Sequence, residues 1–275
     1  MKGINNKYIG VFDSGFGGLD ILRTITKRLP DYNYIYLGDT ARTPYGTRSS
    51  EVIYGFTKQA INFLFENGCE IIIFACNTAS SEALKKIQQE YLPKYYPNKK
   101  VLGVLIPTAE EAVTKTRNNK IGVIATEGTI RSESFKKELL KLNPRTKVYQ
   151  MACPLLVPIV EAGEQNSNFT EIILTKYLEP LMKQGIDTLI LGCTHYGILE
   201  NKIKKIVGKK VIVLSEAKII PKKLEIYLKK HSDIEKELGK NKKRVFYSTD
   251  LTDRFTKLGS KFFGNKIKAK KIIFK

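Results

Sequence analysis

Short apolar runs alternate along the chain with longer segments in which apolar residues recur at helical spacing. Unbroken apolar runs rich in β-branched residues are typical of strands buried in a parallel sheet. They predict strands at 8–12, 34–37, 71–75, 101–106, 121–125, 147–152, 188–191 and 211–214, and one more near 245–247. The helical spacing predicts helices at 19–29, 52–65, 80–91, 132–142 and 169–183, another through 110–113, and a helical, basic C-terminal segment. This alternation indicates an α/β fold whose parallel strands are joined by right-handed crossovers.

Two of the predicted strands end in similar sequences, each with a cysteine at its carboxyl end. Cys76 follows Gly68 by eight positions, and Cys193 follows Gly185 by eight positions. Asn-Thr follows the first cysteine and Thr-His follows the second, so polar side chains accompany both thiols. The two strand ends are therefore the main candidates for chemistry.

A second internal correspondence relates residues 121–126 to residues 9–14, with Thr126 in the place of Ser14. Together the two correspondences predict two pseudo-symmetric domains, each a parallel sheet flanked by helices. A polar segment with two prolines, just before residue 98, indicates a boundary. We assign 1–97 plus 210–275 to a discontinuous first α/β domain and 98–209 to a second α/β domain.

Ligands of open parallel sheets bind outside the carboxyl ends of the strands. We therefore expect the active site in the cleft between the two domains, where side chains at these ends converge. Glu161 lies beside an apolar segment with two prolines, which makes it a candidate for a partly buried acid. The candidates at the strand ends are Asp13, Ser14, Cys76, Asn77, Thr126, Cys193, Thr194 and His195.

A glycine-rich segment, residues 13–18, separates the first predicted strand from the first helix. Glycines let a ligand approach the backbone, and a helix N-terminus favours an anion. The segment is not a dinucleotide fingerprint, because Asp20 stands where a third glycine is required, and no Gly-Lys-Ser/Thr follows as in a P-loop. A carboxylate ligand is favoured, with Asp13 beside it, and no cofactor is expected.

A pseudo-symmetric cleft would place one thiol on each side of a bound ligand. This suits a reaction in which one thiolate removes a proton from a carbon and the opposite thiol returns a proton to the other face. Each thiol needs a neighbour that adjusts its pKa, and Asp13 is a candidate for Cys76, as is His195 for Cys193. A hydrolase with Cys193 as nucleophile and His195 as base is the alternative, since residues i and i+2 of a strand point the same way.

Composition narrows the function classes. The chain of 275 residues has no apolar run long enough to span a membrane, and its first seven residues lack the apolar core of a secretory signal. The four cysteines form no CxxC pair and suit a reducing, cytoplasmic location, with Cys69 and Cys153 as buried residues. Only two histidines are present and the cysteine spacing matches no zinc motif, so no metal is expected.

The net charge of +20 leaves a nucleic-acid partner open. Most of the basic residues are lysines, and they interleave with apolar residues at helical spacing, as they do on solvated helix faces. A generic lysine-rich surface is therefore favoured over a dedicated nucleic-acid site.

Four motifs contain most of the residues named above. They are Asp13-Ser14-Gly15-Phe16-Gly17-Gly18-Leu19, Gly38-Asp39-Thr40-Ala41-Arg42-Thr43-Pro44-Tyr45-Gly46, Ala75-Cys76-Asn77-Thr78-Ala79 and Gly192-Cys193-Thr194-His195-Tyr196. With these motifs the chain resembles, over almost its whole length, the glutamate racemases of the aspartate/glutamate racemase superfamily. Two local departures stand beside the motifs: Gly197 follows the His-Tyr pair where the family usually has Pro, and Ser215-Glu216 replaces an Asp-Ser or Asp-Pro pair.

The resemblance implies a cofactor-independent and metal-free interconversion of L- and D-glutamate that supplies D-glutamate for peptidoglycan synthesis. It implies that Cys76 acts on D-glutamate and Cys193 on L-glutamate, with Asp13, His195 and Glu161 as further catalytic groups. The family is typically dimeric, so a homodimer is expected. The substrate-binding positions that the resemblance implies are Asp13, Ser14, Pro44, Tyr45, Gly46, Asn77, Thr78, Thr126, Thr194 and His195.

Two further alternatives stay open on the sequence alone. Aspartate or another amino acid is the alternative substrate within the same superfamily. A basic nucleic-acid-binding protein on an inactive racemase fold is the alternative from another class. A contact with DNA gyrase, to whose inhibition some family members have been linked, is kept as a secondary alternative.

Overall fold

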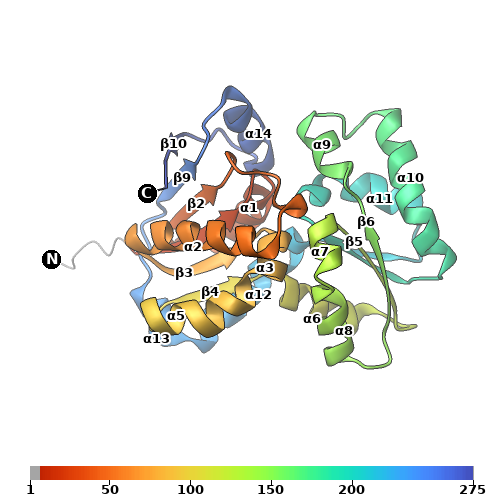
Figure 1. Cartoon of the computed structure of the whole chain (residues 1–275), viewed down its shortest axis with the longest axis horizontal. Coiled ribbons are helices and arrows are strands. Elements are labelled where there is room, and N and C mark those ends of the chain that lie inside the picture. Colours follow the sequence, from red (N-terminus) through yellow and green to blue (C-terminus); the bar gives the residue numbers. More distant parts are fainter. Residues whose placement is uncertain (1–6, 275) are drawn as a thin grey trace.

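Aromatic and β-branched residues build two separate parallel sheets, which Figure 1 shows side by side. The computed structural model describes residues 7–274, so residues 1–6 of the segment examined for a secretory signal lie outside the described part. The larger sheet has the order β10 (Ala269–Lys271), β9 (Arg244–Ser248), β2 (Tyr34–Gly38), β1 (Tyr8–Asp13), β3 (Cys69–Phe74) and β4 (Lys100–Gly103). The smaller sheet has the order β6 (Lys147–Ala152), β5 (Lys120–Ala125), β7 (Thr188–Gly192) and β8 (Ile212–Leu214).

Helices flank both sheets, which confirms the predicted α/β fold class. The helices of the larger unit are α1 (Gly18–Arg28), α2 (Ser50–Glu66), α3 (Asn77–Glu82), α4 (Leu84–Lys86), α5 (Leu92–Tyr95), α12 (Glu216–Lys230), α13 (Ser232–Glu237) and α14 (Asp253–Phe263). Those of the smaller unit are α6 (Leu105–Lys115), α7 (Glu127–Arg131), α8 (Ser134–Leu142), α9 (Leu156–Glu161), α10 (Asn168–Lys183) and α11 (Glu200–Val207). Short η segments lie at Tyr45–Thr47 (η1), Ile87–Tyr91 (η2) and Thr194–Leu199 (η3). No helix within residues 7–274 is both long and apolar enough to cross a membrane.

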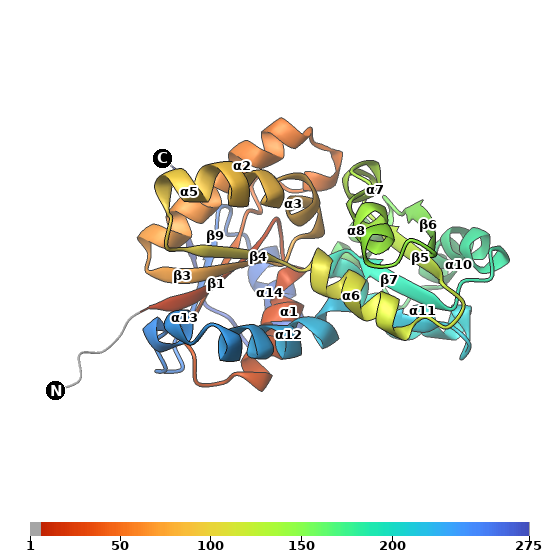
Figure 2. The same ribbon diagram turned by 90° about the horizontal axis from the view of Figure 1, so that it is seen from below.

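The larger sheet is buried on both faces, as its unbroken apolar runs predict. Figure 2 shows α2, α3 and α5 on one side of it and α1, α12, α13 and α14 on the other. Side chains alternate between these faces along each strand. Val11 and Ile73 belong to the core that includes α1 and α12, whereas Phe12 and Phe74 belong to the core that includes α2.

The two sheets repeat one four-stranded core. The order β2-β1-β3-β4 in the larger sheet corresponds to β6-β5-β7-β8 in the smaller one. The register is repeated as well: Val11 pairs with Ile73, and Val123, its counterpart in the sequence repeat, pairs with Ile190. Topology and register therefore agree with the pseudo-symmetry expected from the sequence, and β9 and β10 extend only the larger sheet.

The two glycines that begin the cysteine repeats have the same backbone role. Gly68 has φ 87° and Gly185 has φ 71°, a left-handed conformation that side chains with a Cβ disfavour. Gly68 lies just after α2 and Gly185 just after α10, where a glycine commonly ends a helix. The constant distance from glycine to cysteine follows from repeating one helix–turn–strand connection.

Sheet pairing corrects the two predicted domain boundaries. The division at 97/98 and 209/210 assigns β4 to the second domain and β8 to the first. In the structure β4 pairs with β3 of the larger sheet, and β8 pairs with β7 of the smaller sheet. The two prolines before residue 98 do not end the unit: Pro93 lies in the first turn of α5, and Pro97 lies in the turn before β4.

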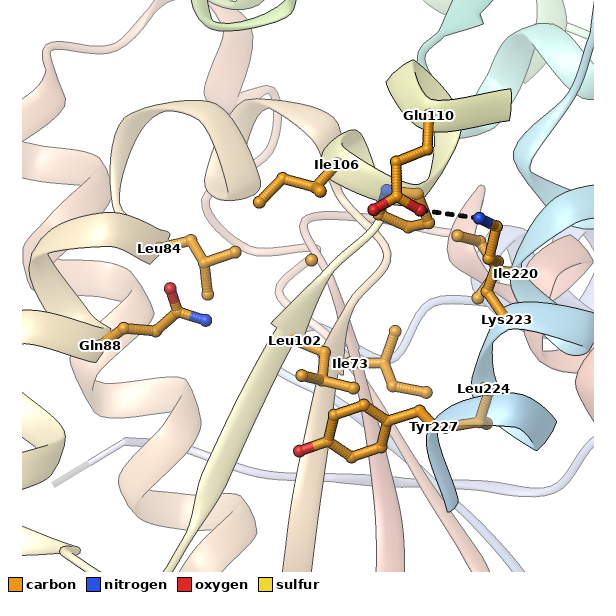
Figure 3. A pocket seen from close by; sticks show the side chains of 12 residues that line it. Ile73, Leu84, Gln88, Leu102, Ile106, Glu110, Ile220, Lys223, Leu224 and Tyr227 are labelled. Carbon is orange, nitrogen blue, oxygen red and sulfur yellow. Dashed lines mark hydrogen bonds and ion pairs between the residues drawn. The ribbon is translucent and has the colours of Figure 1, made fainter. Parts of the chain in front are cut away.

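The chain enters the smaller unit through α6 and returns through α12, and these two helices pack together. Figure 3 shows the ion pair that joins them, in which Lys223 Nζ lies 2.7 Å from the Glu110 carboxylate. Both side chains are partly exposed, so the pair stabilises the contact by about 0–1 kcal/mol. A mainly apolar cavity of about 260 Å³ lies beside the two helices, and its lining contains none of the predicted site residues.

Candidate active site

Hydrogen bonds join strand ends of the two sheets across the cleft. Thr194, after β7, donates from Oγ1 to Asp13 Oδ1 at the end of β1, at 3.4 Å. Thr78, in α3 after β3, lies 2.9 Å from Thr126, after β5, oxygen to oxygen. All four side chains were predicted site residues, and the structure brings them together because carboxyl ends of parallel strands meet at one edge of a sheet.

Cys76 lies where β3 passes into α3. Its side chain is buried, and its Sγ atom accepts a hydrogen bond from the Ala79 backbone N–H at 3.5 Å. Ser14 Oγ lies 3.4 Å from the same sulfur. Burial raises the pKa of the Cys76 thiol to about 11, and the nearby Asp13 charge acts in the same direction. Cys76 is therefore protonated at neutral pH.

Cys193 lies at the matching position after β7, beside a chain of two further ionisable groups. Its Sγ atom is 3.9 Å from His195 Nδ1, and His195 Nε2 is 3.1 Å from Glu161 Oε1. The Glu161 carboxylate accepts a hydrogen bond from Nε2–H, so in the neutral ring Nδ1 is the acceptor that faces the thiol. Burial raises the pKa of the Cys193 thiol well above its usual range, and the nearby Asp13 charge acts in the same direction.

The local backbone around Cys193 differs from the prediction. A strand geometry was expected to bring Cys193 and His195 to the same side, but β7 ends at Gly192 and η3 begins at Thr194. The first turn of η3, rather than a strand, carries His195 to the thiol. Glu161 ends α9 and is only 16% exposed, in agreement with the expectation of a partly buried acid.

Asp13 lies at the centre of the interface but makes no hydrogen bond with Cys76 among the contacts of residues 7–274. Its Oδ2 atom accepts from the Gly15 backbone N–H at 2.9 Å, and its Oδ1 atom accepts from Thr194. The carboxyl group is fully buried, and burial raises its pKa despite the opposing charge of His195. The side chain that contacts the Cys76 thiol is instead that of Ser14.

The loop at Pro44, Tyr45 and Gly46 reaches the smaller unit through its backbone. Tyr45 is buried, and its hydroxyl donates to Asp39 within its own unit, so this side chain holds the loop rather than facing the cleft. A Cβ atom on Gly46 would lie 2.8 Å from Thr126 Cβ, closer than real Cβ contacts allow. Glycine therefore permits the approach of the two units at this point.

A cavity of about 430 Å³ opens beside this loop. Its lining includes Pro44, Gly46, Thr126 and Glu161, and Arg254 from α14 stands at its edge, 3.7 Å from the Glu161 carboxylate. Through Thr126 and Glu161 the cavity borders the residues that contact Thr78 and His195. It is therefore a solvent-accessible pocket next to the strand ends that carry the thiols.

Three contacts in the site were not predicted from the sequence. Glu216, at the start of α12, accepts a hydrogen bond from Asn77 Nδ2 at 2.9 Å. Thr129 Oγ1 lies 3.1 Å from Thr126, and Arg254 lies near Glu161. Only Glu216 had a sequence signal, as a departure from the family pattern. In residues 7–274 no three His, Cys, Asp or Glu side chains are grouped as metal ligands.

Comparisons with known proteins agree with this geometry. A family model described as Asp/Glu/Hydantoin racemase matches residues 10–219. The glutamate racemase of Persephonella marina is 41% identical over 265 residues, which are 96% of this chain and 96% of that protein. The crystal structure of the Francisella tularensis glutamate racemase in complex with D-glutamate superposes with a TM-score of 0.88 at 35% identity, covering 98% of both chains. A Bacillus anthracis glutamate racemase isoform gives a TM-score of 0.89 at 35% identity, also covering 98% of both.

These matches cover the strand ends, the cleft and nearly all of the chain, so they define the class of protein. The chain belongs to the Asp/Glu/Hydantoin racemase family, and within that family to the glutamate racemases.

We predict that Gly46→Ala impairs racemisation while Gly55→Ala does not. The added Cβ at Gly46 must push the loop away from Thr126, and misplacement by a fraction of an ångström to an ångström costs on the order of tenfold to a hundredfold in kcat/KM. Gly55, in α2, has nothing within 4 Å of its added Cβ and provides the matched control. Steady-state glutamate racemisation measures both variants, and equal activities would contradict the role of this contact.

Proposed function

We propose that the chain interconverts L- and D-glutamate through two facing thiols, Cys76 and Cys193, without a cofactor. One thiolate removes the proton from Cα, and the electron pair of the broken C–H bond is delocalised into the α-carboxylate. The opposite thiol then delivers its own proton to the other face of Cα. The observation that supports this most directly is the pair of buried cysteines at equivalent strand ends of one cleft.

For L-glutamate, Cys193 is the base in this proposal. Burial holds its pKa well above the usual range, so the thiolate forms only if a neighbouring base accepts the proton. His195 Nδ1, at 3.9 Å, is in position to accept it. The Glu161 carboxylate at Nε2 then stabilises the imidazolium that forms. In the reverse direction the same imidazolium returns the proton.

For D-glutamate, Cys76 is the base, and its support is of a different kind. The Ala79 backbone N–H and the Ser14 hydroxyl are donors that stabilise a thiolate by hydrogen bonding. Asp13 remains our proposed acid–base helper, because burial raises its pKa and brings it closer to the range used in proton exchange. The Ser14 hydroxyl, which lies 3.4 Å from the Cys76 sulfur, is the proposed relay between Asp13 and the thiol.

Neutral donors hold the substrate in this proposal. Glutamate carries two carboxylates and one ammonium group, and the side chains at the strand ends offer an amide from Asn77 and hydroxyls from Thr78, Thr126 and Thr194. Pro44, Tyr45 and Gly46 contribute through their backbone, since the Tyr45 hydroxyl is already bound to Asp39. Such preorganised dipoles stabilise the negative charge that develops on the α-carboxylate during proton removal.

We also propose a metabolic role, a location and an oligomeric state for the protein, based on the resemblance to the glutamate racemases. D-glutamate is a building block of peptidoglycan, so we propose that the product serves cell-wall synthesis in the cytoplasm. A homodimer is proposed from the resemblance to the family. The Francisella tularensis relative binds D-glutamate, which supports glutamate as the ligand of this cleft as well.

Removing either catalytic thiol should abolish racemisation in both directions. We expect Cys76→Ala and Cys193→Ala each to lower kcat by on the order of a hundred- to ten-thousandfold, the usual contribution of a general acid or base. Cys69→Ala is the control. Cys69 is a buried thiol in the strand that leads to Cys76, and it packs among apolar residues at the opposite end of β3. Circular dichroism of glutamate, with aspartate assayed in parallel, measures the rates. Near-full turnover in either site variant would refute the two-thiol scheme.

The pH dependence follows from the raised pKa of Cys76. Burial moves this pKa from an ordinary value near 9 up to about 11, so the thiolate fraction of the free enzyme increases with pH throughout the neutral range. We expect kcat/KM for D-glutamate to rise between about pH 7 and about pH 8.5, by up to about tenfold per pH unit. A profile that is flat or falling over this interval would show that an ionised Cys76 is not required.

A further inference from the structure

Asn77 and Glu216 form a buried pair beside the catalytic thiols, where the chain returns from the smaller unit to the larger one. Asn77 Nδ2 donates to Glu216 Oε2 at 2.9 Å. The two residues are 2% and 3% exposed, respectively. Glu216 begins α12 directly after β8, and Asn77 directly follows Cys76. The pair therefore connects the strand end of one catalytic cysteine with the helix through which the chain returns to the larger unit.

The remaining oxygen of each side chain in this pair is buried without a hydrogen-bond partner. These two atoms are Asn77 Oδ1 and Glu216 Oε1. Both are acceptors if Glu216 is ionised, and a buried acceptor without a partner is destabilising. If Glu216 carries a proton on Oε1, a small rotation lets that proton bond to Asn77 Oδ1. One proton then satisfies both orphaned atoms in a two-bond ring between acid and amide.

The surrounding charges favour the same state. The Asp13 charge raises the pKa of Glu216, and a Glu216 charge would raise the pKa of Cys193. Asp20 lines the small cavity next to Glu216. All three are acidic groups; Asp20 is paired with Arg23, and Lys218 of α12 is paired with Glu200. Burial raises the pKa of Glu216 well above its usual range, which agrees with the geometry.

We propose that Glu216 is a neutral carboxylic acid that pairs with Asn77 through two hydrogen bonds and so fixes the orientation of the Asn77 amide. Its acid O–H holds Asn77 Oδ1, and its carbonyl oxygen accepts one N–H of Nδ2. The second N–H of Nδ2 is left for the substrate. Glu216 is a positioning residue in this account, because it acts on the substrate through Asn77.

Neutrality has a consequence for the ligand. An ionised Glu216 is only an acceptor, so it could bond to either N–H group of Asn77. It would also add a negative charge to a cleft that binds a dicarboxylate. A neutral acid removes this repulsion and prevents the amide from rotating its oxygen toward the substrate carboxylate. The inference rests on the proposed role of Asn77 in substrate binding, but the protonation state of Glu216 is measurable without turnover.

Infrared difference spectroscopy of the wild-type protein against Glu216→Gln tests the protonation state at neutral pH. We expect the spectrum to lose the C=O stretching band of a protonated carboxylic acid. Loss of carboxylate bands instead would overturn the proposal. That result would fit an ionised Glu216 hydrated by one water in the adjoining cavity, which measures about 10 Å³ and borders Cys193.

Kinetics of two variants test the positioning role. Glu216→Ala leaves Asn77 without its partner, and we expect KM for glutamate to rise on the order of tenfold or more, with a smaller change in kcat. Glu216→Gln can form the equivalent two-bond ring with Asn77, so we expect it to restore most of the loss. Equal impairment in both variants would overturn the proposal.

The two readouts separate failure of this inference from failure of the proposed function. If the wild-type protein does not racemise glutamate, the two-thiol proposal fails while the infrared result still stands. If racemisation occurs but the carboxylate bands are lost, only the role of Glu216 fails. Thermal unfolding of each variant shows whether the Ala variant is folded, and Glu216→Gln decides the question if it is not.

Discussion

The hydrogen bonds between opposing strand ends are the constraint on which the site depends. Asp13 with Thr194 and Thr78 with Thr126 join the two sheets where their carboxyl ends meet. These contacts lie at the same strand ends as the two thiols, and both cysteines are buried there. Burial then raises the thiol pKa values, so the resting protein holds protonated cysteines that need a partner before either acts as a base. The packing of the two sheets at these strand ends therefore also buries the thiols and raises their pKa values.

The pseudo-symmetry of the fold extends to the backbone but not to the groups around the thiols. The four-stranded core, its register and the glycines before the cysteine strands are repeated. Cys193 has an imidazole and a carboxylate in line, whereas Cys76 has a hydroxyl and a backbone N–H. The two enantiomers of glutamate differ in configuration at Cα, and the rest of the bound ligand meets different surroundings on the two sides. Different helpers at equivalent positions suit that inequality.

Features encoded within a short stretch of sequence were predictable, whereas features that depend on contacts between distant segments were not. The strands ending at Cys76 and Cys193 were predictable because apolar runs and a left-handed glycine mark them within about ten residues. The boundaries near 98 and 210 were not, because β4 and β8 are assigned to a sheet only by pairing with β3 and β7. The contact of Asn77 with Glu216 spans 139 positions, and no local pattern announces it. Tyr45 is a local exception: its hydroxyl binds Asp39, six positions away, instead of facing the cleft.

The central claim is that two different groups handle the proton on the two faces of Cα. Racemisation of L-glutamate in deuterated water, followed over the first few per cent of conversion by mass spectrometry of the separated enantiomers, tests it most directly. Two thiols predict that the D-glutamate formed carries deuterium at Cα, because its proton comes from Cys76 after exchange with solvent, while the remaining L-glutamate stays unlabelled. Early D-glutamate that retains the original protium would show that one group returns the proton it removed, and would contradict the account.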